Sequence, residues 1–154
     1  NTYFSNLEKK GRFTNLASVT NEVKLMMDPT ADPFAAPADG VVAEPQRFGA
    51  KDVTDLTWKS LLDAYTCTEC GRCTAACPAN QTGKLLSPRK IMMDTRDRLE
   101  EVGKNIDKNG KFMEDGKQLL NDYITAEEIW ACTSCNACVE ECPVVVAVIE
   151  HGKH

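Results

Sequence analysis

The residues most able to do chemistry in this chain are its eight cysteines, which fall into two short groups. Each group follows the pattern C-x2-C-x2-C-x3-C-P, and no cysteine is left over. The first group contains Cys67, Cys70, Cys73 and Cys77, and the second contains Cys132, Cys135, Cys138 and Cys142. Thiolates at this spacing are ligands of 4Fe-4S clusters. The sequence therefore predicts two 4Fe-4S clusters, each held by four cysteines.

The spacing inside each group allows its first three cysteines to bind three corners of one cluster. In two-cluster ferredoxins the fourth cysteine of this pattern binds the other cluster, because the turn into proline carries it away. The predicted ligand sets are therefore Cys67, Cys70, Cys73 and Cys142 for cluster 1, and Cys132, Cys135, Cys138 and Cys77 for cluster 2. With four thiolates for each cluster, no iron is left open for a substrate, and no catalytic residue is predicted.

Other roles for the cysteines fit the pattern less well. Zinc sites with four cysteines usually pair two C-x2-4-C hairpins rather than a doubled triplet followed by Cys-Pro. Disulfides belong to secreted domains, but these cysteines are tightly grouped and no signal segment is visible. A three-iron cluster would leave one cysteine unused. Clusters that only staple a structural or scaffold subunit, without redox turnover, remain the alternative, because a motif states what is bound and not what it does.

The two groups belong to a longer internal repeat, in which residues 65–78 align without gaps with residues 130–143. Tyr65 and Trp130 each precede the first cysteine by two positions, where they could shield a cluster or pack in the core. Gly71 and Asn136 occupy the same place, and both tolerate the left-handed backbone that tight wrapping round a cluster can require. The repeat predicts two equivalent half-sites.

We expect one helix immediately before the first cysteine group and another after it. Apolar residues between Asp52 and Tyr65 recur at helical spacing and predict one helix running into Cys67. After the group, Ser87 followed by Pro88 resembles an N-cap and first helical position, and Gly103 could end that helix.

The second group is preceded by a looser stretch and then a short helix. Residues 104–117 are expected to be rich in loops, with a turn at Asn109-Gly110. Thr125 with Glu128 forms a capping box, which predicts a helix leading into the second group. The expected fold class is all-α, with two cluster-binding loops.

The domain organisation follows from composition. Residues 1–50 contain four prolines among alanine, aspartate and glycine, and they are interpreted as an extended N-terminal arm or linker, with simple disorder as the alternative. Residues 51–154 are expected to form the dicluster domain. The chain begins at Asn1 rather than Met, which fits a processed chain or a piece of a larger protein.

Charge and hydropathy argue against nucleic-acid binding and against a transmembrane segment. The formal charge of -5 and the lack of a basic stripe argue against nucleic-acid binding. The longest apolar run, Val144–Ile149, is far shorter than the roughly 20 residues that span a bilayer, so no transmembrane span is expected in this chain.

Basic residues surround the first cysteine group in sequence: Arg72, Lys84, Arg89 and Lys90. They fit either a solvated face or a positive charge that steers a partner or tunes the reduction potential of a cluster.

A doubled motif with a long helix-forming insertion resembles the alpha-helical ferredoxin domain of heterodisulfide reductase-like iron-sulfur subunits. More narrowly, Leu56–Asp63, Cys67–Cys73 and Thr82–Lys90 are similar to segments of membrane-bound Fe-S oxidoreductases. The resemblance covers roughly residues 48–143. It implies an alpha-helical ferredoxin-like fold with an electron-transfer role, whereas the sequence after Pro143 departs from the family's pattern.

The resemblance implies a subunit or domain of an oxidoreductase complex that is associated with a membrane. We expect the chain to relay single electrons between a flavin or thiol enzyme and a quinone or haem acceptor, without being the catalyst itself. Its expected partners are a flavoprotein, a CCG-domain protein or a haem membrane subunit. Its expected location is cytoplasmic, at the inner face of the membrane through a partner or a membrane domain.

Overall fold

The computed structural model describes residues 23–24, 26–28 and 49–144. The chain divides into two compact units, of which one is Arg12–Phe48 and the other includes Gly49–His154. In the first unit, residues 23–24 and 26–27 are helical. The arm expected at 1–50 lies almost wholly outside the described residues, so its extended form remains a prediction.

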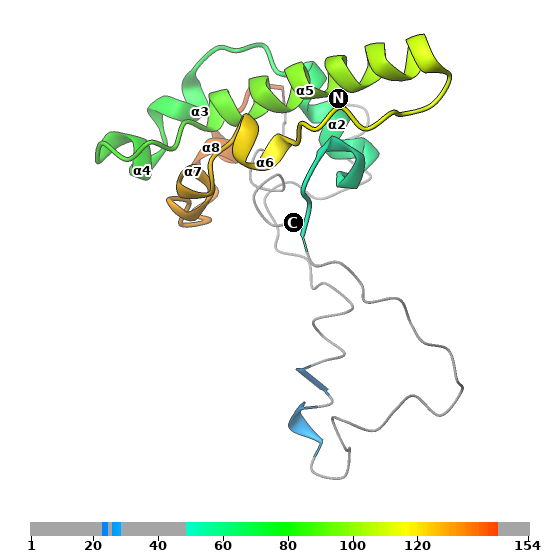
Figure 1. Ribbon diagram of the computed structural model, residues 1–154. Helices are drawn as coiled ribbons and strands as arrows, with labels where there is room; N and C mark the ends of the chain where they lie inside the picture. Colours follow the sequence, from blue (N-terminus) through cyan, green and yellow to red (C-terminus); the bar gives the residue numbers. More distant parts are fainter. Residues whose placement is uncertain (1–22, 25, 29–48, 145–154) are drawn as a thin grey trace. The chain divides into compact units, whose positions relative to one another are not determined.

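Residues 49–144 form helices joined by loops, and this part of the chain contains no extended strand (Figure 1). The elements in chain order are η2 (Val53–Asp55), α2 (Trp58–Thr66), α3 (Arg72–Ala75), α4 (Pro78–Gln81), α5 (Pro88–Asn109), α6 (Leu119–Asp122), α7 (Ala126–Trp130) and α8 (Ala137–Glu140). The prediction of an all-α class is confirmed.

The long helix α5 begins where the sequence indicates and ends later. The Ser87 hydroxyl accepts a hydrogen bond from the Lys90 amide, and Pro88 occupies the first helical position. The helix passes through Gly103 and ends only at Gly110, whose φ of 74° is left-handed. The predicted end at Gly103 is therefore wrong. A glycine inside a helix costs only about 1 kcal/mol relative to alanine, whereas the left-handed C-cap favours glycine strongly.

The single helix expected from Asp52 to Tyr65 is two elements. Asp52 and Asp55 form a capping box around the short 3-10 helix η2. Leu56 then adopts an extended conformation, and the Thr57 hydroxyl accepts a hydrogen bond from the Ser60 amide to start α2. Two consecutive N-caps explain the break, because each N-cap residue lies outside helical geometry.

Helix α2 packs against α5 with a face that periodicity alone did not indicate. The aromatic side chains of Trp58 and Tyr65 are 55% and 52% exposed. The buried residues of the helix are Lys59, Ser60, Asp63 and Ala64. Lys59 Nζ lies 2.5 Å from Asp63 Oδ1, so the buried cation has a partner one helical turn away. Ion pairing compensates for charges that burial alone would destabilise.

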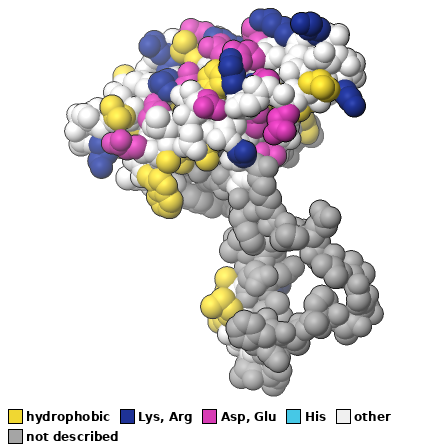
Figure 2. Space-filling model, viewed as in Figure 1, with side chains coloured by type: hydrophobic (Ala, Val, Ile, Leu, Met, Phe, Trp, Pro, Cys, Tyr) yellow, Lys and Arg dark blue, Asp and Glu magenta, His cyan; other side chains and the backbone are white. Residues whose placement is uncertain are grey.

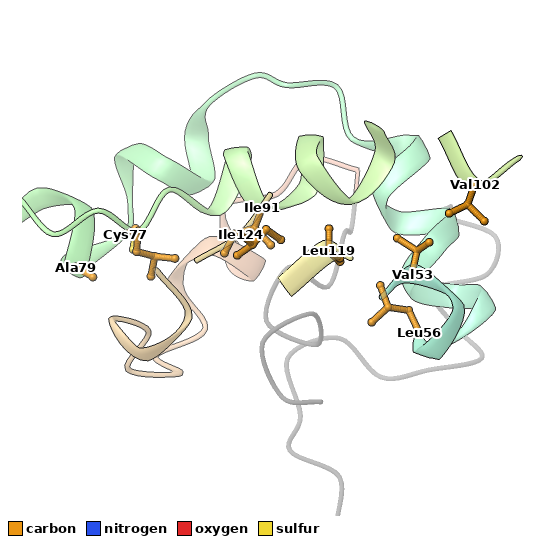
Figure 3. Packing of buried hydrophobic residues seen from close by; sticks show 9 residues of the cluster. Val53, Leu56, Cys77, Ala79, Ile91, Val102, Leu119 and Ile124 are labelled. Carbon is orange, nitrogen blue, oxygen red and sulfur yellow. The ribbon is translucent and has the colours of Figure 1, made fainter. Parts of the chain in front are cut away.

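The main apolar core lies along one side of α5. Figure 3 shows Ile91, Leu119 and Ile124 gathered beneath the helix, with Val53 and Val102 farther along it. The other buried members of this cluster are Leu56, Cys77, Ala79 and Leu86. A cysteine of the first motif is therefore embedded in the same core that holds α5 in place.

Arg98, near the middle of α5, anchors the helix to two distant segments. Its guanidinium is fully buried and donates paired hydrogen bonds to the carboxylates of Asp52 and Asp115, at distances between 2.6 and 3.2 Å. It also donates to the Lys117 carbonyl, 2.8 Å away. The Arg98 hydrogen bonds lower the pKa of the Asp115 carboxyl to about 2. One side chain thus fixes the start of η2 and the 110–118 loop against α5.

Replacing Arg98 with methionine should destabilise the fold by about 3 kcal/mol, because two carboxylates lose the cation that compensates them. The expected readout is a lower urea midpoint for the loss of helical circular dichroism, measured on anaerobic holoprotein. Lys104→Met on the same helix is the matched control. Lys104 is 78% exposed, and its carboxylate partner among the described residues is Glu100 at 3.7 Å, so the change should alter stability by less than about 1 kcal/mol. Equal midpoints for the two variants would contradict this role for Arg98.

Candidate iron-sulfur site

The two cysteine loops share an unusual backbone conformation. In the first loop Glu69 and Gly71 have φ values of 56° and 81°, and in the second Ser134 and Asn136 have φ values of 54° and 66°. Gly71 and Asn136, which both tolerate a left-handed backbone, do adopt it. Left-handed residues between right-handed ones turn successive backbone N–H groups inward, which creates the anion-binding concavities found at many Fe–S sites.

Residue type gave no warning of the left-handed conformation at Glu69 and Ser134. The only available signal was the repeat itself, because both residues lie two positions after the first cysteine of their motif. One consequence is visible in the second loop, where the Ser134 amide donates a hydrogen bond to Cys132 Sγ at 3.4 Å. A hydrogen bond of this kind stabilises negative charge on the sulfur.

The first loop surrounds a cavity that also includes the last cysteine of the second motif. The cavity has a volume of about 340 Å³ including its open mouth, and Cys67, Cys70, Cys73 and Cys142 all line it. Helix α5 contributes Arg89 and Met92 to the same wall. The structure therefore brings together the four cysteines of the first predicted ligand set, although 68 residues separate Cys73 from Cys142 along the chain.

The second loop lies next to the last cysteine of the first motif. Cys138 is buried, and burial raises the pKa of its thiol to about 12, with further contributions from neighbouring thiols. The neighbours are Cys132, Cys73, Cys135 and Cys77. All four cysteines of the second predicted ligand set are therefore close together, and Cys73 of the first set is also near them.

The two loops meet where the short helices α3 and α8 pack against each other. Cys73 and Cys138 belong to one buried group at this contact, together with Ala64, Met92 and Val139. Burial also raises the pKa of the Cys73 thiol. Since metal binding needs thiolates, assembly of the site must release protons from thiols that are buried at the interface.

The cysteine residues differ in their access to solvent. Cys73, Cys77 and Cys138 are buried, whereas Cys70, Cys132 and Cys135 are exposed. Within residues 49–144, no three cysteine, histidine or acidic side chains converge as they would on a single metal ion. The first set instead surrounds a volume, and its soft sulfur ligands and the left-handed residues of its loop fit a 4Fe-4S cluster. Such clusters supply one-electron chemistry when bound.

Helix α5 holds both loops through polar contacts near its N-terminus. The Thr74 hydroxyl of α3 lies 3.0 Å from the Ser87 hydroxyl and accepts a hydrogen bond from the Arg89 amide at 3.1 Å. Lys90 reaches the other half-site, with its Nζ 3.0 Å from Glu128 of α7. The sequence did not reveal these contacts, because they join residues that are far apart along the chain.

The aromatic residues before each motif are not core residues. Tyr65 is 52% exposed, and Trp130 is 87% exposed. Ordinary core packing, one of the two interpretations of these side chains, is therefore wrong for Trp130.

Comparison with known proteins supports the iron-sulfur interpretation. The model of the 4Fe-4S dicluster domain family matches residues 59–143. The chain is 36% identical over 129 residues to "Probable iron-sulfur-binding oxidoreductase FadF" of Bacillus subtilis, covering 65% of this chain and 18% of the relative. No solved structure matches the chain.

Two further relatives have similar coverage. The chain is 33% identical to an "EtfAB:quinone oxidoreductase" of Syntrophomonas wolfei, covering 68% of this chain and 17% of the relative. It is 32% identical to a "Probable membrane-anchored ferredoxin" of Chromohalobacter salexigens, covering 70% of this chain and 18% of the relative. The chain thus spans less than a fifth of the length of these relatives.

Paired cysteine replacements can test how the two motifs share their ligands. If Cys142 binds with the first motif, Cys67→Ala with Cys142→Ala removes two ligands from one cluster, and about four irons should remain. Cys132→Ala with Cys142→Ala then damages both clusters, and the iron content should fall well below four. Iron and acid-labile sulfide analysis of anaerobically reconstituted protein gives the readout. The opposite order of iron contents would mean that each motif keeps its own fourth cysteine.

Proposed function

We propose that this chain, which belongs to the 4Fe-4S dicluster domain family, relays single electrons between a flavin or thiol enzyme and a quinone or haem acceptor. The electrons are transferred through its two 4Fe-4S clusters. In this proposal the chain is the iron-sulfur subunit or domain of a larger oxidoreductase. Catalysis at the substrate belongs to a partner.

The proposed ligand exchange is central to the relay. Cluster 1 is bound by Cys67, Cys70, Cys73 and Cys142, and cluster 2 by Cys132, Cys135, Cys138 and Cys77. The observation that best supports this assignment is that Cys142 shares one cavity with the first three cysteines of the other motif. Cys77 is also among the thiols that influence the buried Cys138 thiol, as the second set requires.

Ligand exchange would also hold the clusters close to each other. Cys73 binds cluster 1 in this assignment, Cys77 binds cluster 2, and only the three residues of one helical turn separate them. Cys73 and Cys138, one from each set, lie in the same buried group. A short and dry path of this kind suits electron transfer from one cluster to the other.

The partners and the location are inferred from the names of relatives. An "EtfAB:quinone oxidoreductase" suggests a flavoprotein on one side of the relay and a quinone on the other. A "Probable membrane-anchored ferredoxin" suggests attachment to a membrane. No helix in residues 49–144 is long and apolar enough to cross a bilayer. We therefore propose a position at the cytoplasmic face of a membrane, held by a partner subunit or a further domain.

The relay predicts about eight irons per chain and two clusters that interact magnetically when both are reduced. Iron and sulfide analysis with EPR spectra, taken before and after dithionite reduction of anaerobically purified protein, would measure both. Reoxidation of the reduced clusters by a water-soluble quinone should restore the starting spectrum. Bound zinc, or iron that never changes its redox state, would leave a metal-stapled scaffold as the better explanation.

A further inference from the structure

The part of the domain that carries the second motif is acidic. Residues 118–144 contain five carboxylate side chains and neither lysine nor arginine. Glu128 is paired with Lys90, which reaches over from α5. Glu127, Glu140 and Glu141 are all exposed. The surface around this motif is therefore negatively charged, in contrast to the surroundings of the first motif.

An apolar side chain of the same stretch is exposed to solvent. Trp130 ends α7, is 87% exposed, and stands two positions before Cys132. Cys132 and Cys135 are exposed as well. Glu127 lies three positions before Trp130 on α7, so the two side chains share a helix face. Figure 2 shows hydrophobic side chains gathered at the surface in the region where Figure 1 draws α7.

We propose that Trp130 and its flanking carboxylates form the docking surface through which cluster 2 exchanges electrons with a redox protein whose own centre lies in an apolar spot ringed by lysine or arginine. This inference rests on the proposed relay. Tryptophan is the residue type most enriched among interface hot spots, and opposite charges on two rims accelerate encounter and fix orientation. The exposed cysteines of the second motif bring the cluster within reach of such a partner.

Oxidised cytochrome c is a suitable probe, because lysine side chains surround its exposed haem edge. Each electron that leaves a reduced cluster converts one ferric haem to ferrous haem, which stopped-flow absorbance measures directly. Trp130→Ala should slow this reaction roughly tenfold, the equivalent of about 1.4 kcal/mol in affinity. Glu127→Gln should slow it less, and added salt should slow the wild-type reaction because it screens the charges.

Two controls separate docking from damage to the clusters. Met113→Ala removes another exposed apolar side chain, 49% exposed and outside the acidic stretch, and should leave the rate unchanged. Benzyl viologen, a small dye that needs no docking surface, should react equally with every variant. Equal cytochrome c rates for Trp130→Ala and wild type, or a rate that salt does not affect, would overturn the docking surface. Clusters that cannot be reduced at all would instead overturn the relay.

A positive charge also lies at the cavity of the first ligand set. Arg89 lines the cavity of the first ligand set, and its Nη1 lies 3.9 Å from the position of a Cβ added to Gly71. Among the described residues, no carboxylate pairs with its guanidinium. The only acidic residue of the loop, Glu69, is already paired with Arg96. Within the described part of the chain, a cation without a carboxylate partner therefore lies at this cavity.

Among the described residues, the cation that reaches the second half-site is Lys90, and its charge is compensated by Asp94 and Glu128. The loop between Cys132 and Cys138 contains no charged side chain, whereas the first loop also carries Arg72. Reduction adds negative charge to a cluster that four thiolates already make anionic, and a nearby cation favours that reduced form. The geometry points to Arg89 as the residue that raises the reduction potential of cluster 1 above that of cluster 2, so that a single electron rests on cluster 1.

EPR-monitored redox titration of the holoprotein tests this order. Arg89→Gln should lower the higher of the two midpoint potentials by about 28 mV, which is a roughly threefold change in the ratio of reduced to oxidised cluster at 59 mV per tenfold. Arg89→Lys keeps the charge and should restore most of the wild-type value. Lys104→Gln removes a charge from the same helix, about 22 Å away along its axis, and should change neither midpoint.

A shift of the lower midpoint alone would show that cluster 1 is the weaker electron acceptor, and unchanged midpoints would show that Arg89 has no influence. Either result overturns the assignment while leaving the relay intact. The relay itself fails only if the wild-type clusters show no reversible reduction in the same titration.

Discussion

The packing of α3 against α8 is the contact on which the rest of the domain depends. It buries Cys73 and Cys138 side by side and carries Cys77 and Cys142 toward the opposite motif. Each motif therefore has a cysteine of the other motif among its neighbours. The thiols buried here have raised pKa values, so they favour the protonated form until a metal displaces the protons. Cluster assembly and closure of this contact are therefore expected to be one coupled process.

The long insertion between the motifs acts as a frame for that contact. Helix α5 reaches α3 through Thr74, α7 through the Lys90 ion pair, and the start of the domain through Arg98. Only 6% of the residues in the chain are aromatic, and the most exposed large apolar side chain in the described part is Trp130. Directional hydrogen bonds and ion pairs thus hold these segments in place, as a larger apolar core would otherwise do.

The internal repeat makes the backbones of the two half-sites similar, while the side chains around them make their electrostatics different. Left-handed residues occur at the same two places in each loop. Arg89 comes from α5, outside the repeat, and it lines the cavity of the first predicted ligand set. The second half-site instead has Trp130 and exposed carboxylates. Duplication of one cluster-binding loop can thus give a relay whose two ends differ in partner and in electron affinity.

The sequence by itself determined the cofactor, the grouping of the cysteines and the starts of α5 and α7, because spacing and N-caps act over only a few residues. Ser87 and Thr125 cap their helices as expected. Only the tertiary structure decided which face of α2 is buried, since packing against α5 covers the face that carries the Lys59–Asp63 pair. It likewise decided the partners of Arg98 and the place of Arg89 beside the first loop. Contacts between distant segments depend on how the chain folds back on itself, and no local pattern records them.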